Sequence, residues 1–130
     1  MKFLNKSGLI VLLLLLITSC DPPKYYNYFI TNNCDEVIEV KIEVSQWGSP
    51  EIKIVILQIN PDATQLIHSD EWFQPLDNSM VEYFFKRGIV ITKGNDTSKV
   101  NYVNKDLWDF RITSKNHANS YLTVKPEDFE

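Results

Sequence analysis

Glycine, cysteine and histidine are scarce in this chain, which has four glycines, two cysteines and two histidines among 130 residues. A phosphate-binding loop needs glycines close together so that backbone amides can approach the phosphates, and the chain has no such cluster. No serine lies in the Gly-x-Ser-x-Gly elbow of many hydrolases either. With these signatures absent, we expect a protein that is not an enzyme.

Basic clusters are also missing. Lys86-Arg87 is the only adjacent pair of basic residues, whereas nucleic acids and anionic surfaces are bound by basic patches. Residues 20–130 carry 11 basic and 17 acidic side chains, a formal charge of −6. This balance argues against a nucleic-acid partner and suits solubility or a cationic partner.

No apolar run is long enough to span a bilayer. The longest, Leu9–Ile17, falls well short of the roughly 20 residues that a spanning helix needs. Lys2 and Lys6 precede it, and the small residues Thr18-Ser19 follow it directly before Cys20. This layout is typical of a secretory signal, so we expect residues 1–19 to be removed.

The five residues Leu16-Ile17-Thr18-Ser19-Cys20 resemble the lipobox of bacterial lipoproteins. In that family the cysteine thiol receives a diacylglycerol and the peptide is cleaved just before it. Ile17 stands where leucine is usual and Ser19 where alanine or glycine is commoner, and both are accepted variants. The resemblance implies a lipid-anchored protein of the bacterial cell envelope, on the outer membrane and facing the periplasm or the surface. Two acyl chains suffice for stable anchoring.

Two interpretations of Cys34 stay open. If Cys20 carries lipid, Cys34 is a single thiol in an oxidising compartment, and we expect it to be buried. If Cys20 carries no lipid, the two cysteines can form a disulfide that ties the N-terminal arm to the first turn.

The rest of the chain alternates apolar and polar residues with period two, as strands with one buried face do. The clearest case is 36–44, where apolar residues from Ile38 to Val44 alternate with charged ones. In 52–59 the apolar residues fall on both parities, which predicts a strand that is covered on both faces or lies centrally. The other extended candidates are 25–32, 64–68, 89–92, 100–103, 107–112 and 120–124.

One segment changes period. Ser79 and Glu82 match a capping box, and Gly88 stands where a helix ends in a left-handed residue, which predicts a short helix over 79–87. A competing interpretation continues a strand through Tyr83 and Phe85.

Together these elements predict an all-β fold, an antiparallel β-sandwich that is immunoglobulin-like or related, with at most one short helix. The expected organisation is a signal peptide over 1–19, a lipidated cysteine and short tether over 20–24, and the sandwich over 25–130. The stretches ITNNCDEVIEV, INPDATQLI and SYLTVKPEDF resemble small lipoproteins of Bacteroidetes bacteria that have such sandwiches. That resemblance implies fold and compartment, and it carries no functional residues across.

The densest polar cluster is His68-Ser69-Asp70-Glu71. With His117 it offers zinc ligands or a general base by residue type. The spacing is not that of a zinc site, because His68 and Asp70 are two residues apart and His117 is distant, so we expect no metal and no cofactor.

Aromatic residues in predicted loops are the better candidates for binding. Trp47, Trp72 and Phe73, with Asp70 and Glu71, form a speculative binding surface, because aromatics supply contact area at low entropic cost. Trp108 alternates with Phe110 and Ile112 and is expected in the core.

These observations predict a non-enzymatic binding or accessory module that is membrane-anchored through lipid and holds a protein or glycan partner. The alternative is an inhibitor or immunity-type lipoprotein whose acidic loop, 68–77, blocks a cationic hydrolase or toxin. The two differ in salt dependence, because charge pairing between exposed groups is screened and apolar contact is not.

The lipid assignment predicts an intact mass. Protein purified from membranes should have the mass of a chain that starts at Cys20 with a diacylglycerol on its thiol, because cleavage and lipidation are coupled at that residue. A lipid-free mass that fits a disulfide between Cys20 and Cys34 would contradict the assignment.

Overall fold

The computed structural model describes residues 22–45 and 48–130. These residues form eight strands, one short α-helix and two 3-10 helices. Their bounds are β1 Lys24–Asn32, β2 Ile38–Ser45, β3 Ile52–Ile59, β4 Thr64–Trp72, α2 Met80–Phe84, β5 Ile89–Lys93, β6 Asp96–Thr97, η1 Lys105–Leu107, β7 Trp108–Ser114, β8 His117–Val124 and η2 Pro126–Phe129.

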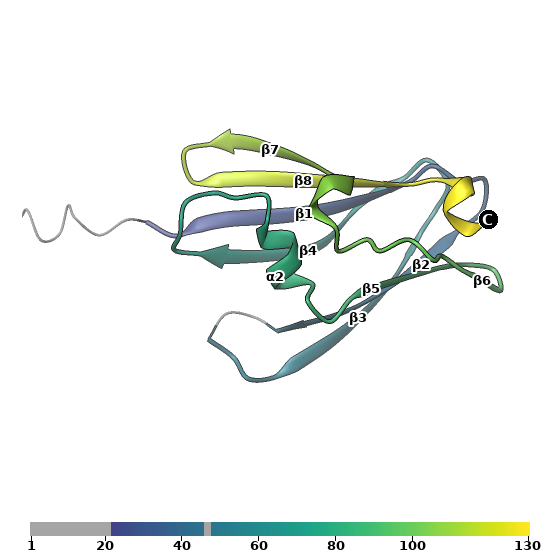
Figure 1. Ribbon diagram of the computed structural model, residues 1–130, viewed down its shortest axis with the longest axis horizontal. Coiled ribbons are helices and arrows are strands. Elements are labelled where there is room, and N and C mark those ends of the chain that lie inside the picture. The colour runs from purple at the N-terminus through teal and green to yellow at the C-terminus, as the bar shows by residue number, and fades with distance from the viewer. Residues whose placement is uncertain (1–21, 46–47) are drawn as a thin grey trace, which may run out of the picture.

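The strands build two packed sheets, which confirms the predicted all-β sandwich (Figure 1). Sheet A has the order β4-β1-β8-β7, and sheet B has the order β3-β2-β5-β6. Neighbouring strands are antiparallel except β1 and β8, which run parallel from Tyr25 opposite His117 to Asn32 opposite Val124. The chain crosses between the sheets after β1, β3, β4 and β6, whereas β2 with β3, β5 with β6 and β7 with β8 are antiparallel neighbours within one sheet.

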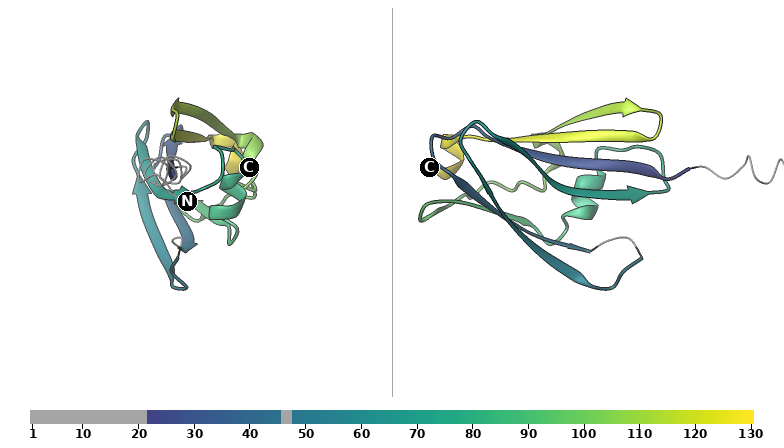
Figure 2. Two further views of the ribbon diagram at one scale, coloured as in Figure 1. Left: turned by 90° about the vertical axis from the view of Figure 1, so that its left-hand side faces the viewer. Right: turned by 180° about the vertical axis from the view of Figure 1, so that it is seen from behind.

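Alternate residues of β1 and β2 point into the space between the sheets, as the period-two pattern predicts. One of the two largest of them, Tyr28, makes edge-on ring contacts to Phe84, Phe85 and Trp108, with centroids 5.0–5.8 Å apart. Phe84 comes from α2, which lies between the sheets at the end where β1 begins (Figure 2). Burial raises the pKa of the Tyr28 hydroxyl well above its usual range.

Cys34 is buried, 3% exposed, as expected for a single thiol. Its sulfur lies 3.9 Å from the carbonyl oxygen of Val124. Burial raises the pKa of the Cys34 thiol, so the residue is a weak nucleophile.

The structure corrects the prediction of a buried or central strand over 52–59. β3 is an edge strand of sheet B, and Ile52, Ile54 and Ile56 are 46%, 56% and 57% exposed. In this chain, the strand with apolar residues at both odd and even positions therefore has one face in the core and the other face exposed.

The helix is shorter than predicted, and no capping box forms. Ser79 Oγ donates to Asp77 instead of capping the helix. Gly88 does adopt the expected left-handed conformation, with φ +97°.

The prediction of a strand over 100–103 was wrong. This segment is a turn, and its aromatic residue is held by hydrogen bonds rather than by a sheet: Tyr102 Oη lies 2.7 Å from Ser98 Oγ and donates to Asp128.

Two further positions differ from expectation. Trp72 was expected in a loop, but it is the last residue of β4. Trp108 is in the core as predicted, whereas Ile112 is 60% exposed. Ile112 lies on the same face of β7 as Trp108, but it is near the end of an edge strand, where less of the fold covers it.

The Asn32 side chain joins the two sheets. This fully buried amide donates to the carbonyl oxygens of Glu36 and Ile59, at 2.8 and 2.9 Å, and accepts from the amide of Cys34 at 2.9 Å. Its backbone also binds the β3–β4 turn, because Asn32 N–H donates to Ala63 and Asn32 C=O accepts from Asp62.

Replacing Asn32→Ala should therefore lower the free energy of unfolding by about 2–4 kcal/mol, because three backbone groups lose their partner and two of those hydrogen bonds are buried. Asn33→Ala is the matched control: Asn33 is exposed, and its loss should change stability by no more than about 0.5 kcal/mol. Urea unfolding measures both. Equal midpoints for the two variants would contradict the joining role of Asn32.

Candidate functional site

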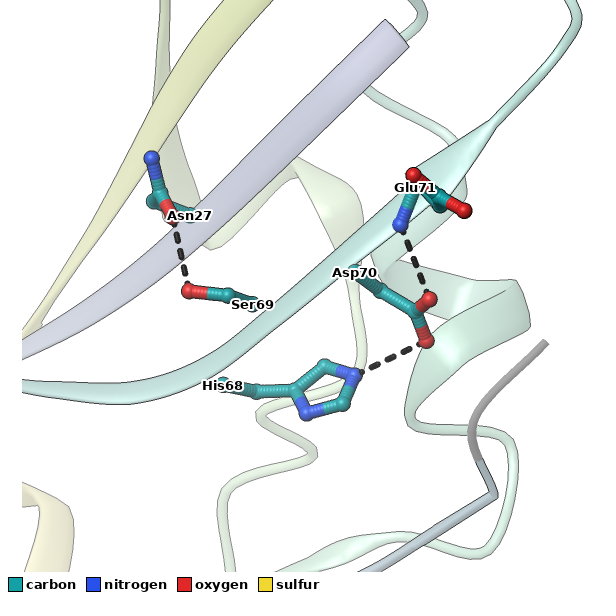
Figure 3. A network of polar contacts seen from close by, with 5 residues as sticks. All are labelled: Asn27, His68, Ser69, Asp70 and Glu71. Carbon is teal, nitrogen blue, oxygen red and sulfur yellow. Dashed lines mark hydrogen bonds and ion pairs between the residues drawn. The ribbon is translucent and has the colours of Figure 1, made fainter. Parts of the chain in front are cut away.

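The predicted polar cluster is an internal contact. His68 Nε2 lies 3.2 Å from Asp70 Oδ2, and both side chains are under a tenth exposed, at 7% and 6% (Figure 3). The other carboxylate oxygen of Asp70 accepts from the backbone amide of Glu71 at 2.8 Å. The His68 ring packs against Phe84 and Phe85 with centroids 6.0 and 5.6 Å apart. The Asp70 carboxylate is therefore held against the core side of β4 and is almost fully buried.

The other predicted binding residues do not form one surface. Trp72 is half-buried and contacts the Tyr83 ring, with centroids 5.0 Å apart. Glu71 lies opposite Tyr25, while Trp72 lies opposite Lys24, so their side chains alternate between the two faces of sheet A. Phe73 is 46% exposed. Trp47 and Cys20 lie outside the described residues.

His117 lies apart from this cluster, on β8. Its Nδ1 is 2.8 Å from Ser114 Oγ, and its ring stacks on Tyr25 at 5.0 Å. Within residues 22–45 and 48–130, no group of three or more histidine, cysteine or carboxylate side chains is arranged to hold a metal ion. Over the same residues, no helix has the length and apolar character to cross a membrane.

The most exposed apolar surface was not predicted from the sequence. Ile52, Ile54 and Ile56 project from the outer face of β3 and form what we name the isoleucine stripe. Across the neighbouring strand, Lys41 separates Ile56 from Val90, which is 49% exposed. A contiguous exposed apolar row of this kind is typical of protein-interaction surfaces.

The edges of the two sheets differ in how they are protected. β4 and β7 carry register shifts in their pairing, and β6 has two residues. Irregular pairing and shortness both hinder the addition of another strand. β3 has eight residues in regular register with β2, and from Ile54 to Ile59 it carries no charge. Among the described strands, β3 is therefore the edge most open to pairing.

A hollow of about 350 Å³ runs between β3 and β4, the edge strands of the two sheets, and we name it the side groove. It opens on the same side of the sandwich as the free edge of β3. Lys53, His68 and Ser69 contribute its polar atoms, and the rest of its lining is apolar: Val44, Val55, Leu57, Leu66 and Ile67.

The outer face of sheet A is occupied by its own contacts. Two ring pairs stack there, Tyr25 on His117 and Phe29 on Tyr121, each with centroids 5.0 Å apart. Between the pairs, Asn27 accepts a hydrogen bond from Ser69 at 2.7 Å (Figure 3). Asn27 also donates to Asn119 at 3.1 Å. Rings that stack on each other have less free face on which a sugar could stack. The outer face of sheet A is therefore a weaker candidate for glycan binding than β3 is for peptide binding.

Comparison with protein-family models, with curated proteins and with solved structures found no match to this chain. The isoleucine stripe and the side groove thus have to be interpreted from their own chemistry.

Substitution of the two acidic residues of the predicted site, Asp70 and Glu71, should affect stability to different extents. Asp70→Ala leaves the buried His68 Nε2 without its partner and should destabilise the fold by about 1–3 kcal/mol. Glu71→Ala, one residue away and without a role in that contact, should cost less than about 0.5 kcal/mol. Chemical denaturation tests both, and equal losses would show that Asp70 has no special structural role.

Proposed function

We propose that this protein is a lipid-anchored, non-enzymatic module of the bacterial cell envelope that binds an extended segment of a partner protein along β3. The observation that carries the proposal is the coincidence of three features on one strand. β3 has a free and regular edge, the isoleucine stripe on its outer face and the side groove beside its inner face.

Strand addition uses all three features together. A segment paired with β3 satisfies the free backbone groups of the edge, and its side chains alternate between the two faces. On one face they extend the isoleucine stripe, and on the other they enter the side groove.

This alternation defines the chemistry of the partner segment. Because the stripe is apolar and the groove presents polar and apolar surface in about equal amounts, the segment that fits has β-branched or other apolar residues on the stripe side and a mixture of apolar and polar residues on the groove side. Lys53 stands at the groove and gives a carboxylate on the partner a place to pair. The partner is therefore an uncharged or weakly acidic extended segment.

The proposed lipid anchor rests on the lipobox-like residues around Cys20, and the membrane that we propose for it is the outer membrane. The short distance in sequence between Cys20 and the start of β1 at Lys24 would keep the module near the bilayer. An anchored module meets its partner at the raised local concentration of a surface, so a moderate affinity is enough.

The inhibitor alternative draws on the net charge of −6 over residues 20–130. Its acidic loop is weakened by the geometry, because Asp70 is engaged inside the fold. Salt dependence still separates the alternatives, since binding through exposed charges weakens as salt rises.

A photocrosslinking residue at Gln58, on the outward side of β3, tests the proposal in cells that make the full chain. We expect an adduct with a partner protein, lost in Ile54→Glu because a charge on the stripe opposes apolar contact. Leu107→Glu is the control, since Leu107 is 42% exposed on another surface, and its adduct should persist. Both sites are exposed, so neither change should cost more than about 0.5 kcal/mol of stability.

The same adduct, formed in isolated membranes at low and high salt, separates the possible partners. A salt-insensitive adduct with another protein supports strand addition. An adduct of twice the mass of the chain means that a second copy occupies β3, and loss at high salt favours the inhibitor. An adduct that is unchanged by Ile54→Glu would refute β3 as the binding site.

A further inference from the structure

A second surface lies at the end of the sandwich where β1 begins. There the start of β1, the end of β4 and the β7–β8 turn meet (Figure 1). Lys24 Nζ donates to Asn116 Oδ1 at 2.8 Å, which ties the first strand to that turn. A shallow cavity of about 320 Å³ opens at this end, and its lining, which we name the end surface, consists of Lys24, Phe73, Pro75, Leu76, Ile112 and Lys115.

The end surface combines exposed apolar groups with lysines. Ile112 is 60% exposed, the highest value among the large apolar side chains of the described residues, and Phe73 is 46% exposed. Lys24 and Lys115 line the same cavity. In a chain whose residues 20–130 have a charge of −6, this pairing of apolar and basic groups is locally distinct.

One acidic group close to this end is already engaged in hydrogen bonds. The carboxylate of Asp77, which follows Leu76, accepts from both the amide and the hydroxyl of Ser79, at 3.1 and 2.7 Å. These hydrogen bonds hold the pKa of Asp77 below its usual range. The carboxylate therefore stays charged but is turned to Ser79, and it does not pair with either lysine in the structure.

The position of the lipid attachment selects the occupant. Cys20 precedes Lys24 by four residues, and four residues span at most about 14 Å when fully extended. A lipid on Cys20 therefore holds the end surface within reach of the phospholipid headgroups.

We propose that the end surface docks on the phospholipid bilayer, with Ile112 and Phe73 entering the boundary between headgroups and acyl chains and Lys24 and Lys115 binding lipid phosphates. The inference rests on the lipid anchor of the proposed function and adds a second contact to it. Apolar groups flanked by lysines are the features that interfacial membrane binding uses.

Docking would orient the module. β3 leads from this end of the sandwich toward the opposite end, where the C-terminus lies, so the isoleucine stripe would extend away from the membrane (Figures 1 and 2). The two surfaces then serve different ligands without overlap, because the end surface contains no residue of β3.

Nitroxide labels on the lipidated full-length protein test this in vesicles of phosphatidylethanolamine with or without phosphatidylglycerol. The labels are placed at Thr113→Cys, beside the end surface, and at Glu127→Cys, at the opposite end. Buried Cys34 should not react. We expect the ratio of oxygen to nickel-chelate accessibility to be several-fold higher at 113 than at 127, and higher still with phosphatidylglycerol.

Two variants and a flotation assay distinguish failure of docking from failure of the lipid anchor. Ile112→Asp should return position 113 to water while the protein still floats with the vesicles, and Leu107→Asp, at the other end of β7, should not. If the protein with an unmutated end surface floats with the vesicles but its label at 113 stays exposed to water, docking is overturned and the anchor is not. Failure to float would overturn the anchor and docking together, and a signal unaffected by phosphatidylglycerol would remove the lysines from the contact.

Discussion

The buried amide of Asn32 is the contact on which the architecture depends. It stands where the chain leaves sheet A, and it binds the end of β3 and the turn that follows β1. A buried backbone group without a partner is costly, so each of these bonds specifies geometry as well as adding stability. Because two of the four crossovers between the sheets, those after β1 and after β3, meet at this residue, the sheets are held together at one end of the sandwich.

The other end is filled in a different way. There α2 lies between the sheets, and Phe84 and Phe85 pack against Tyr28 and the ring of His68 (Figure 2). Sheets joined at one end and wedged by a helix at the other leave their edge strands apart, and the side groove lies between β3 and β4. The binding surface that we propose is thus a consequence of how the core is closed.

Much of the fold could be predicted from the chain because strand alternation is local. β1, β2, β5 and β8 alternate between a buried and a wet face, and that pattern is visible without a partner. Other elements misled. Residues 100–103 have strand-forming composition, but the hydrogen bonds of Tyr102 to nearby Ser98 and to distant Asp128 hold a turn instead. Ser79 and Glu82 have capping-box spacing, but Asp77 takes the serine hydroxyl.

The candidate site was harder to predict than the fold. A row of isoleucines on a strand is buried if another element covers it, and it is an exposed surface if none does. The sequence does not distinguish these cases, and only the strand order shows that β3 is an edge. In the same way, the charge of Asp70 suggested an exposed side chain. In the structure Asp70 is buried, because it contacts His68 two residues earlier on the same strand.

The sequence by itself determined the period of the strands, the turns at Asn60-Pro61-Asp62 and Gly94, and the lipobox-like signal, because each depends on residues adjacent in the chain. Only the tertiary structure decided which apolar residues are covered and which sheet edge stays free. Those outcomes depend on contacts between residues far apart in sequence, such as Asn32 with Ile59, and no local pattern encodes them.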